Sequence, residues 1–156
     1  MVRTYAPVGH TPILAEWWPR DHLSAIGVIS PEGKLEFRCQ EGALNSLKVV
    51  AFLEHLLREV PGRRVVIWDG APIHRGQVIK DFLTNGAAQR LHVERLPAYA
   101  PELKPGEGLW AHLKGVELRH VCCFDIRHLR HELCDAVKPV RRKPRIIKGC
   151  FSAAKL

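Results

Sequence analysis

Two carboxylates, Asp69 and Glu107, stand in sequence settings that suit metal chemistry. Asp69 ends an apolar run that begins at Val65 and is followed by Gly70, which is the pattern of a buried strand that stops at an acid. An acid in that position lies at the carboxyl end of a sheet, where open α/β proteins bind their ligands. Glu107 follows Pro105 at the start of a predicted helix. Hard divalent cations such as Mg²⁺ take one or two such carboxylates together with water and substrate phosphate.

Each acid also has an ordinary structural explanation. Asp69 followed by Gly70 is a common turn sequence. A carboxylate in the third helical position, as at Glu107, offsets the unpaired amides and the positive end of the helix. Taken singly, each residue is explained at least as well in this way, so a functional interpretation depends on the two together.

The elements that must position the two acids alternate between strands and helices after an initial hairpin. The expected strands are 23–30 and 35–39, joined by a turn at 31–33, then 65–69 and 91–96. The expected helices are 45–60, about 74 to 86, one from 105, and a last one capped by Asp125. In chain order, the residues expected on the inner faces of these helices are Leu47, Val50, Leu53, Leu57 and Val60; Val78, Ile79, Phe82 and Leu83; Leu109, Leu113 and Val116; and Ile126, Leu129, Leu133 and Val137. This order predicts an α/β domain with a mixed sheet.

The length of the chain, 156 residues, is that of one domain. We expect residues 1–22 to form an irregular lead, residues 23–118 an α/β core, and residues 119–156 C-terminal helices with a basic region.

Two longer blocks around these acids resemble a known family. They read WDGAPIHRG at residues 68–76 and LPAYAPELKPGEGLWAHLK at residues 96–114. The second block is similar to the signature Pro-x-Tyr-x-Pro-(Asp/Glu)-Leu-Asn-Pro-x-Glu-x-x-Trp of DDE transposases, in the bacterial insertion-sequence group related to mariner elements. Weaker similarity runs from about Arg3 to Leu156 and includes residues 6–12 and 17–27.

The resemblance implies a ribonuclease H-like mixed sheet flanked by helices, in which three acids hold two Mg²⁺ or Mn²⁺ ions. One ion activates water or a 3′-hydroxyl group, and the other stabilises the leaving oxygen of an in-line phosphoryl displacement. By this similarity Asp69 is the second acid and Glu107 the third, and both are catalytic metal ligands. His74 matches a family histidine, which we expect to orient phosphate or the end of the strand, although a histidine that starts a helix needs no such role.

The sequence departs from the family signature just before Glu107. Lys104 replaces the Asn that precedes Pro105, and Gly106 replaces a bulkier residue. The helix that carries Glu107 is therefore predicted to begin with a poor cap and a looser backbone.

A larger departure concerns the first acid of the family. In the family it lies on a strand upstream of the segment that matches residues 3–12, and Asp21 is no obvious substitute for it. We therefore expect a chain truncated at its N-terminus, without the first, central strand of the sheet. The neighbouring strands then lose their partners, so we predict a gap in the sheet, or residues 2–6 poorly filling it.

The charge of the chain favours an anionic partner, because 24 Lys and Arg against 16 Asp and Glu give a net charge of +8. Six of these cations form a run without an acid: Lys138, Arg141, Arg142, Lys143, Arg145 and Lys148. Together with the resemblance, this predicts salt-dependent contacts with transposon-end and target DNA, for which the candidates are His74, Arg75, Lys114, Arg141, Arg142 and Lys143. A solvated basic surface without a ligand explains the run equally well.

Other features exclude several classes of protein. The five cysteines are odd in number and form no CxxC pair, so neither a disulfide framework nor a cysteine zinc site is indicated. His128, His131 and Cys134 lie three apart but lack an evident fourth ligand. No apolar stretch approaches the roughly 20 residues that span a bilayer, and we expect a cytoplasmic protein without a membrane partner.

The leading interpretation is the C-terminal part of a DDE transposase that catalyses Mg²⁺-dependent DNA cleavage and strand transfer in its complete form and is inactive as this chain alone. It could be a decayed remnant or the downstream half of a split reading frame, with a homodimer or an upstream transposase fragment as partner. The competing interpretation is a noncatalytic DNA-binding or interaction module derived from a transposase. A third is an unrelated Mg²⁺ nuclease of the same fold.

Overall fold

The structure is a computed structural model that describes residues 8–9, 22–97 and 103–155. Its strands and helices are β1 (Leu23–Ile29), β2 (Leu35–Glu41), α1 (Ser46–Glu59), β3 (Arg64–Trp68), α2 (Gln77–Thr84), β4 (Leu91–Arg95), α3 (Pro105–His112), α4 (Ile126–Arg141) and α5 (Pro144–Ala153). The order of strands and helices up to α4 agrees with the prediction, and α5 lies in residues 119–156, where C-terminal helices with a basic region were expected. The irregular lead predicted for residues 1–22 falls almost entirely outside the described residues.

Strands β1 and β2 form the predicted antiparallel hairpin, with Leu23 opposite Glu41 and Ile29 opposite Leu35. At its turn the Gly33 amide donates to the Ser30 carbonyl at 2.9 Å. Gly33 has φ = +91°, a left-handed conformation that glycine adopts without steric cost. The prediction of a hairpin at this point is confirmed.

Strands β3 and β4 pair in parallel, from Arg64 opposite Leu91 to Trp68 opposite Arg95, and α2 lies between them in the chain. The buried side chain of Val66 packs with the inner faces of α1 and α2. Val65 and Ile67, on the other face of β3, are 61% and 57% exposed. The prediction of a buried strand here was thus wrong for one face, because helices cover only the side that Val66 occupies.

The two pairs of strands are separate. Within the described ranges, β1 pairs with β2 and β3 pairs with β4, and no hydrogen-bonded ladder joins one pair to the other. The predicted gap between the hairpin and the strand that leads to Asp69 is therefore present among these residues. The alternative that residues 2–6 fill the gap concerns residues outside the described part.

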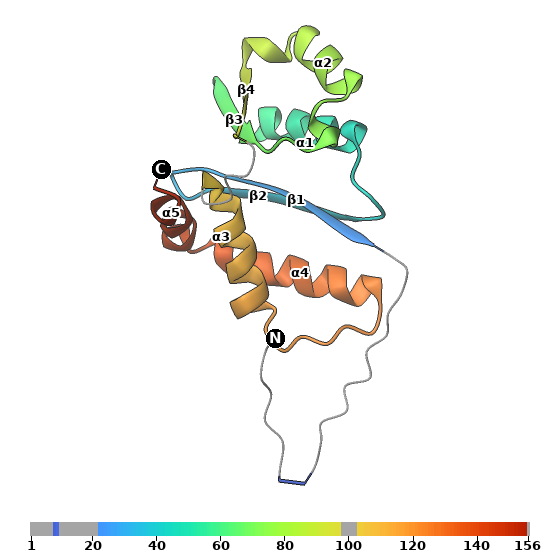
Figure 1. Cartoon of the computed structure of the whole chain (residues 1–156), viewed down its shortest axis with the longest axis vertical. Coiled ribbons are helices and arrows are strands. Elements are labelled where there is room, and N and C mark those ends of the chain that lie inside the picture. Colours follow the sequence, from blue (N-terminus) through green and yellow to red (C-terminus); the bar gives the residue numbers. More distant parts are fainter. Residues whose placement is uncertain (1–7, 10–21, 98–102, 156) are drawn as a thin grey trace.

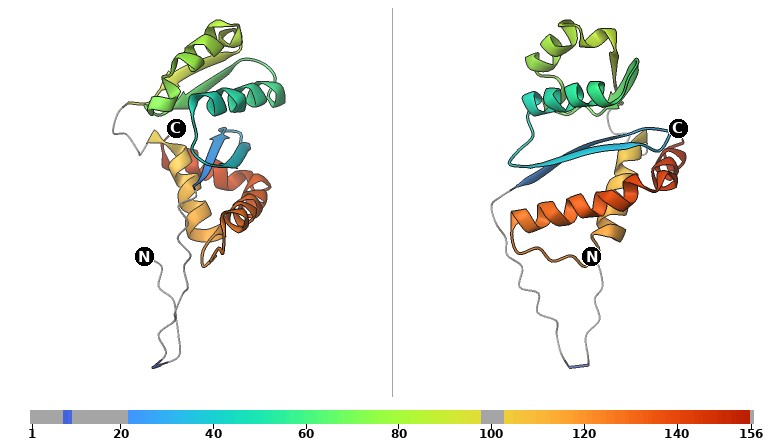
Figure 2. Two further views of the ribbon diagram at one scale, coloured as in Figure 1. Left: turned by 90° about the vertical axis from the view of Figure 1, so that its right-hand side faces the viewer. Right: turned by 180° about the vertical axis from the view of Figure 1, so that it is seen from behind.

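The hairpin is a middle layer between two groups of helices. Figures 1 and 2 show α1 and α2 with β3 and β4 on one side of it, and α3, α4 and α5 on the other. One core cluster joins the hairpin to α3–α5 through Leu35, Phe37, Leu109, Leu113, Leu133, Ala136, Val137, Val140, Ile147 and Cys150. The second joins β3 and β4 to α1 and α2 through Val49, Leu53, Leu56, Val66, Ile79 and Leu91. Partly buried Ile26 and Val28 of β1 pack against the second cluster.

Helix α1 begins and ends where the sequence predicts, but its inner face is rotated. The Asn45 side chain accepts a hydrogen bond from the Lys48 amide at 3.0 Å, which is the predicted N-cap. The buried residues of the helix are Val49, Phe52, Leu53 and Leu56, whereas Leu47 is exposed. The apolar residues of α1 cover a wide part of its surface, so their spacing is compatible with both the predicted and the observed set of buried residues.

Helix α3 continues into a π-helical segment, Leu113–Glu117, in which the Leu118 amide donates to the Leu113 carbonyl at 2.8 Å. Leu113 is fully buried as predicted, but Val116 is 59% exposed. An i→i+5 turn holds more residues than an α-helical turn, so the residue three positions after Leu113 no longer returns to the core. The prediction that Val116 faces inward was wrong for this reason.

The C-terminal helices enclose the first core cluster. The Asp125 side chain accepts a hydrogen bond from the His128 amide at 2.7 Å and caps α4 as predicted. Leu133 and Val137 are buried, but Leu129 is exposed, since the covered part of α4 begins one turn later than expected. Within the described ranges, no helix combines the length and apolar character needed to cross a lipid bilayer.

Candidate active site

Asp69 follows the last residue of β3 and shapes the turn that leaves the strand. Its Oδ1 accepts a hydrogen bond from the Ala71 amide at 3.0 Å, which is a local turn made by an aspartate side chain. The side chain is 45% exposed. The structural explanation of Asp69 as a turn residue therefore holds, and the carboxylate still faces solvent.

His74 lies against Asp69 from the short 3₁₀ turn at Pro72–His74. Its Nε2 is 3.5 Å from Asp69 Oδ1, and its ring stacks on Trp68 at a centroid distance of 4.5 Å and an interplanar angle of 15°. Burial lowers the pKa of His74 below its usual value, and the negative charge of Asp69 only partly opposes this. The imidazole thus contacts both the Trp68 ring and the Asp69 carboxylate.

Lys104 reaches Asp69 from the residue that precedes α3. Its Nζ lies 3.5 Å from Asp69 Oδ2, and its side chain makes no capping bond to the helix. The predicted poor cap is confirmed. The Ala71 amide is the largest influence that lowers the pKa of Asp69, and the charges of Lys104 and His74 add to it against the opposing effect of burial.

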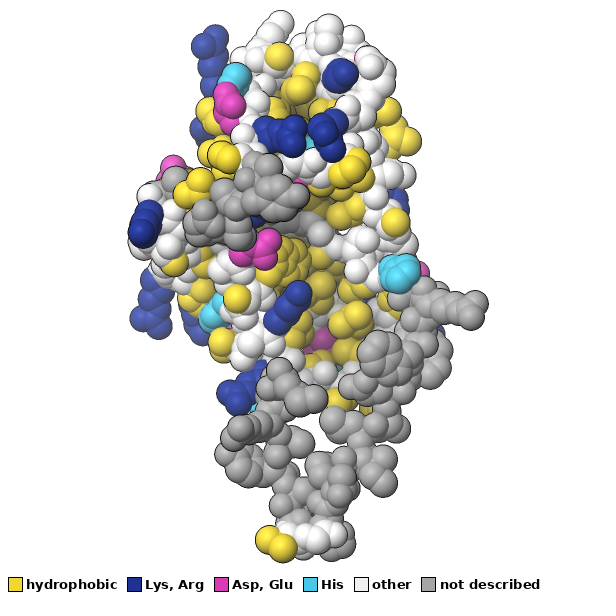
Figure 3. All heavy atoms as spheres, viewed as in Figure 1, with side chains coloured by type: hydrophobic (Ala, Val, Ile, Leu, Met, Phe, Trp, Pro, Cys, Tyr) yellow, Lys and Arg dark blue, Asp and Glu magenta, His cyan; other side chains and the backbone are white. Residues whose placement is uncertain are grey.

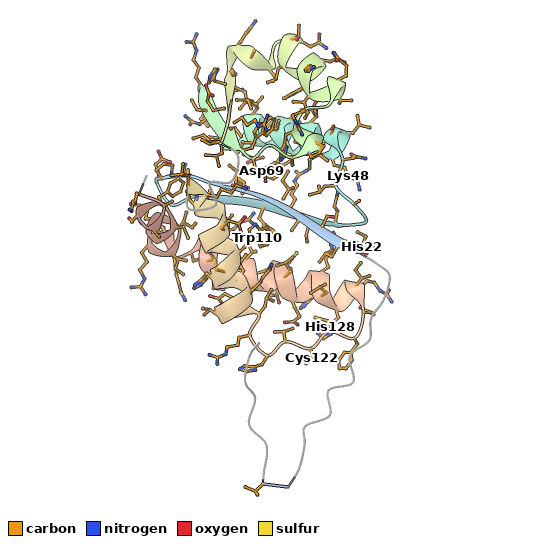
Figure 4. The ribbon with its side chains drawn as sticks, in the orientation of Figure 1. His22, Lys48, Asp69, Trp110, Cys122 and His128 are labelled. Carbon is orange, nitrogen blue, oxygen red and sulfur yellow. The ribbon has the colours of Figure 1, made fainter. Side chains whose placement is uncertain are left out.

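Glu107 stands in the first turn of α3, where its amide donates to the Lys104 carbonyl at 3.0 Å. Lys104 is the N-cap residue of α3, so its contact with Asp69 places the first turn of the helix, which carries Glu107, near the end of β3. Figure 4 shows Asp69 beside the hairpin at the level where α3 begins, with Trp110 further along that helix. The Glu107 side chain is exposed and makes no hydrogen bond or ion pair to another described residue.

Arg95, at the end of β4, is a residue of this site that the sequence analysis missed. Its side chain covers Gly70, because a Cβ built on Gly70 would lie 2.5 Å from Arg95 Nη2 and 2.8 Å from Nε. The carboxyl ends of adjacent parallel strands meet at one edge, so the residue that ends the strand at 91–96 could have been placed beside Asp69 from the sequence.

Among the described residues, the remaining DNA-contact candidates make no hydrogen bond or ion pair with Asp69. Arg75 and Lys114 are exposed, the latter in the π-helical segment beyond Glu107. Arg141 donates to the carbonyls of Leu35 at 3.2 Å and Phe37 at 3.4 Å, so this cation helps to hold α4 on β2.

Two further basic candidates, Arg142 and Lys143, are exposed at the junction of α4 and α5. In Figure 3, Lys and Arg side chains also lie along the edge of the molecule formed by α5. The structure therefore does not bring this C-terminal basic group together with Asp69.

The donor atoms at this edge fit a hard divalent cation in part. Carboxylate oxygens of Asp69 and Glu107 are the ligands that Mg²⁺ prefers, and the Lys104 ammonium already places a positive charge at Asp69 Oδ2. Among the residues that the structure describes, no group of three or more His, Cys, Asp or Glu side chains is placed to hold one metal ion.

Comparison with known proteins decides the family. A sequence profile of the family described as DDE superfamily endonuclease matches residues 2–123. The chain belongs to this family. Among proteins with curated descriptions, none matches the chain significantly.

Solved structures of a DDE transposase share the fold of the chain. The catalytic domain of Mos1 mariner transposase is 15% identical with a TM-score of 0.51, covering 86% of this chain and 81% of that one. The Mos1 catalytic domain with Raltegravir and Mn is 16% identical with a TM-score of 0.57, covering 85% and 78%. The Mos1 paired end complex with Mn is 18% identical with a TM-score of 0.59, covering 97% and 50%. The predicted ribonuclease H-like α/β fold is confirmed.

Proposed function

We propose that this DDE-family chain forms part of a transposase catalytic domain that cleaves DNA and transfers strands with the help of Mg²⁺ or Mn²⁺. The observation that carries the proposal is the closeness of the start of α3 to the end of β3, seen in the 3.5 Å between Lys104 Nζ and Asp69 Oδ2, because Glu107 lies in the first turn of that helix. The Mos1 structures support it, since they were determined with Mn and as a paired end complex.

In this proposal Asp69 and Glu107 supply carboxylate oxygens to the metal site. Divalent ions held there would supply activation of the attacking water or 3′-hydroxyl group and stabilisation of the leaving oxygen. His74 holds the Asp69 carboxylate in place through its contact at 3.5 Å and its stacking on Trp68. Arg95 presents a guanidinium group at the same edge, where a scissile phosphate would carry negative charge.

We further propose that the described residues supply two of the three acids that the family site needs. The first acid then comes from outside the described residues, from an upstream transposase segment or from a partner subunit. The second candidate function is a noncatalytic DNA-binding module. It is favoured by the Lys104 ammonium at Asp69, which opposes metal binding there, and by the basic group on α4 and α5.

Nicking of a supercoiled plasmid, with and without a co-expressed upstream segment of the same transposon, separates the two functions. The proposal expects Mn²⁺- or Mg²⁺-dependent nicking that needs the upstream segment and is abolished by Asp69→Asn or Glu107→Gln. Glu54→Gln, an exposed carboxylate of α1, is the matched control and leaves nicking unchanged. DNA binding without cleavage in both settings would decide for the noncatalytic module.

A further inference from the structure

Lys104 is a cation built into the candidate metal site of this chain. In the family signature the corresponding position is Asn, a neutral residue. Here the ammonium lies 3.5 Å from Asp69 Oδ2, while the Ala71 amide and His74 approach Oδ1. Both oxygens of the carboxylate therefore already face positive or hydrogen-bonding groups.

The Lys104 side chain is well placed to keep this position. It is only 28% exposed, which is low for a lysine beside a half-exposed partner. Its backbone is fixed as the residue that precedes α3, and its carbonyl accepts the Glu107 amide at 3.0 Å. The ammonium thus approaches Asp69 from the helix that carries the second proposed ligand.

A divalent ion that binds Asp69 must share this space with a like charge. Two positive charges a few ångströms apart repel strongly when both are partly shielded from water. The ion must therefore displace the ammonium, and the ammonium costs the site some of its affinity. Lysine can leave, because its long side chain has many rotamers and reaches solvent easily.

We infer that the Lys104 ammonium is a resident counter-ion of Asp69 that competes with divalent cations, so that metal loading requires its displacement. This inference rests on the proposed function, in which Asp69 is a metal ligand. It makes Lys104 a residue that sets the metal affinity of the site without touching the reacting atoms.

The test is titration of the isolated chain with Mn²⁺, followed by the electron paramagnetic resonance signal of the free ion. Lys104→Asn is expected to bind Mn²⁺ about tenfold more tightly than the unchanged chain, as the loss of a close like charge implies. Lys104→Arg keeps the charge and is expected to stay within about twofold. Lys114→Asn removes the same charge from an exposed position in the π-helical segment and is the matched control.

Equal or weaker Mn²⁺ binding by Lys104→Asn, in a chain whose circular dichroism is unchanged, would overturn the inference. Asp69→Asn in both backgrounds separates this outcome from failure of the proposed function. If Asp69→Asn weakens binding but Lys104→Asn has no effect, only the competition is wrong. If Asp69→Asn leaves binding intact in both backgrounds, Asp69 is not a ligand and the proposed function fails as well.

Discussion

The ammonium of Lys104 lies 3.5 Å from the carboxylate of Asp69, although the two residues are 35 positions apart in the chain. This ion pair connects the end of β3 to the start of α3 across the layer boundary formed by the hairpin. It shows that the residue preceding α3, three positions before Glu107, lies beside the end of β3.

Gly33 at the hairpin turn is predicted to tolerate no side chain. Its φ is +91°, and a Cβ would lie 2.6 Å from Pro144 Cβ and 2.9 Å from the Pro144 carbonyl oxygen. Gly33→Ala should therefore lower the free energy of unfolding by more than about 2 kcal/mol, as measured by urea denaturation. Gly149→Ala is the control, because a Cβ at that helical position meets nothing within 4 Å. It should be neutral or stabilise by up to about 1 kcal/mol.

The π-helical segment predicts opposite outcomes for two apolar residues three positions apart. Leu113→Ala should cost about 2–5 kcal/mol of unfolding free energy, because it leaves a cavity in the first core cluster. Val116→Ala should change stability by no more than about 0.5 kcal/mol, since Val116 faces solvent. Equal losses at both positions would mean that α3 continues as a regular α-helix.

The gap between the two pairs of strands predicts an alternating pattern of amide exchange in β3. The Arg64 amide donates to a carbonyl beside β4, and the Trp68 carbonyl accepts from an amide there. Because backbone groups alternate in direction along a strand, the Val66 amide also points toward β4, whereas the amides of Val65 and Ile67 point toward the opposite edge of β3. In hydrogen exchange followed by NMR, Val66 and Trp68 should exchange more slowly than Val65 and Ile67. Uniformly strong protection from Val65 to Trp68 would show that another strand covers that edge.

The basic residues of α4 and α5 are predicted to differ in their contribution to DNA binding. Arg142 and Lys143 are exposed and make no ion pair to a described residue, whereas Lys138 is paired with Asp135. The double variant Arg142→Ala, Lys143→Ala should reduce the slope of log affinity against log salt for duplex DNA by about 2. Lys138→Ala should reduce this slope by less than half as much as the double variant does. An equal reduction per residue would mean that Lys138 contacts DNA as Arg142 and Lys143 do.

Much of the fold follows from local patterns. Asn45 and Asp125 cap helices as their sequence positions predict, and the hairpin and the parallel pair of strands form where alternation and length indicate. Exposure was harder to predict, because it depends on what covers each face. Val65 and Ile67 read as a buried run, yet no described helix covers their side of β3.

The candidate acids, Asp69 and Glu107, stay predictions from the sequence, and the approach of Lys104 to Asp69 was not predicted. The loss of a capping side chain at Lys104 could be read from the sequence, but the direction of a long, flexible side chain depends on the tertiary approach of β3 to α3. Arg95 could have been placed beside Asp69 by the rule that parallel strands end at one edge.

Cleavage of the chain by bound iron tests most directly whether Asp69 and Glu107 serve one metal site. Fe²⁺ with ascorbate and peroxide produces radicals that cut the backbone near the ligands of the ion. We predict cuts close to both residue 69 and residue 107, suppressed together by excess Mg²⁺ and lost together in Asp69→Asn. Cuts near only one of the two acids, or cuts near Glu107 that persist in Asp69→Asn, would contradict a shared site.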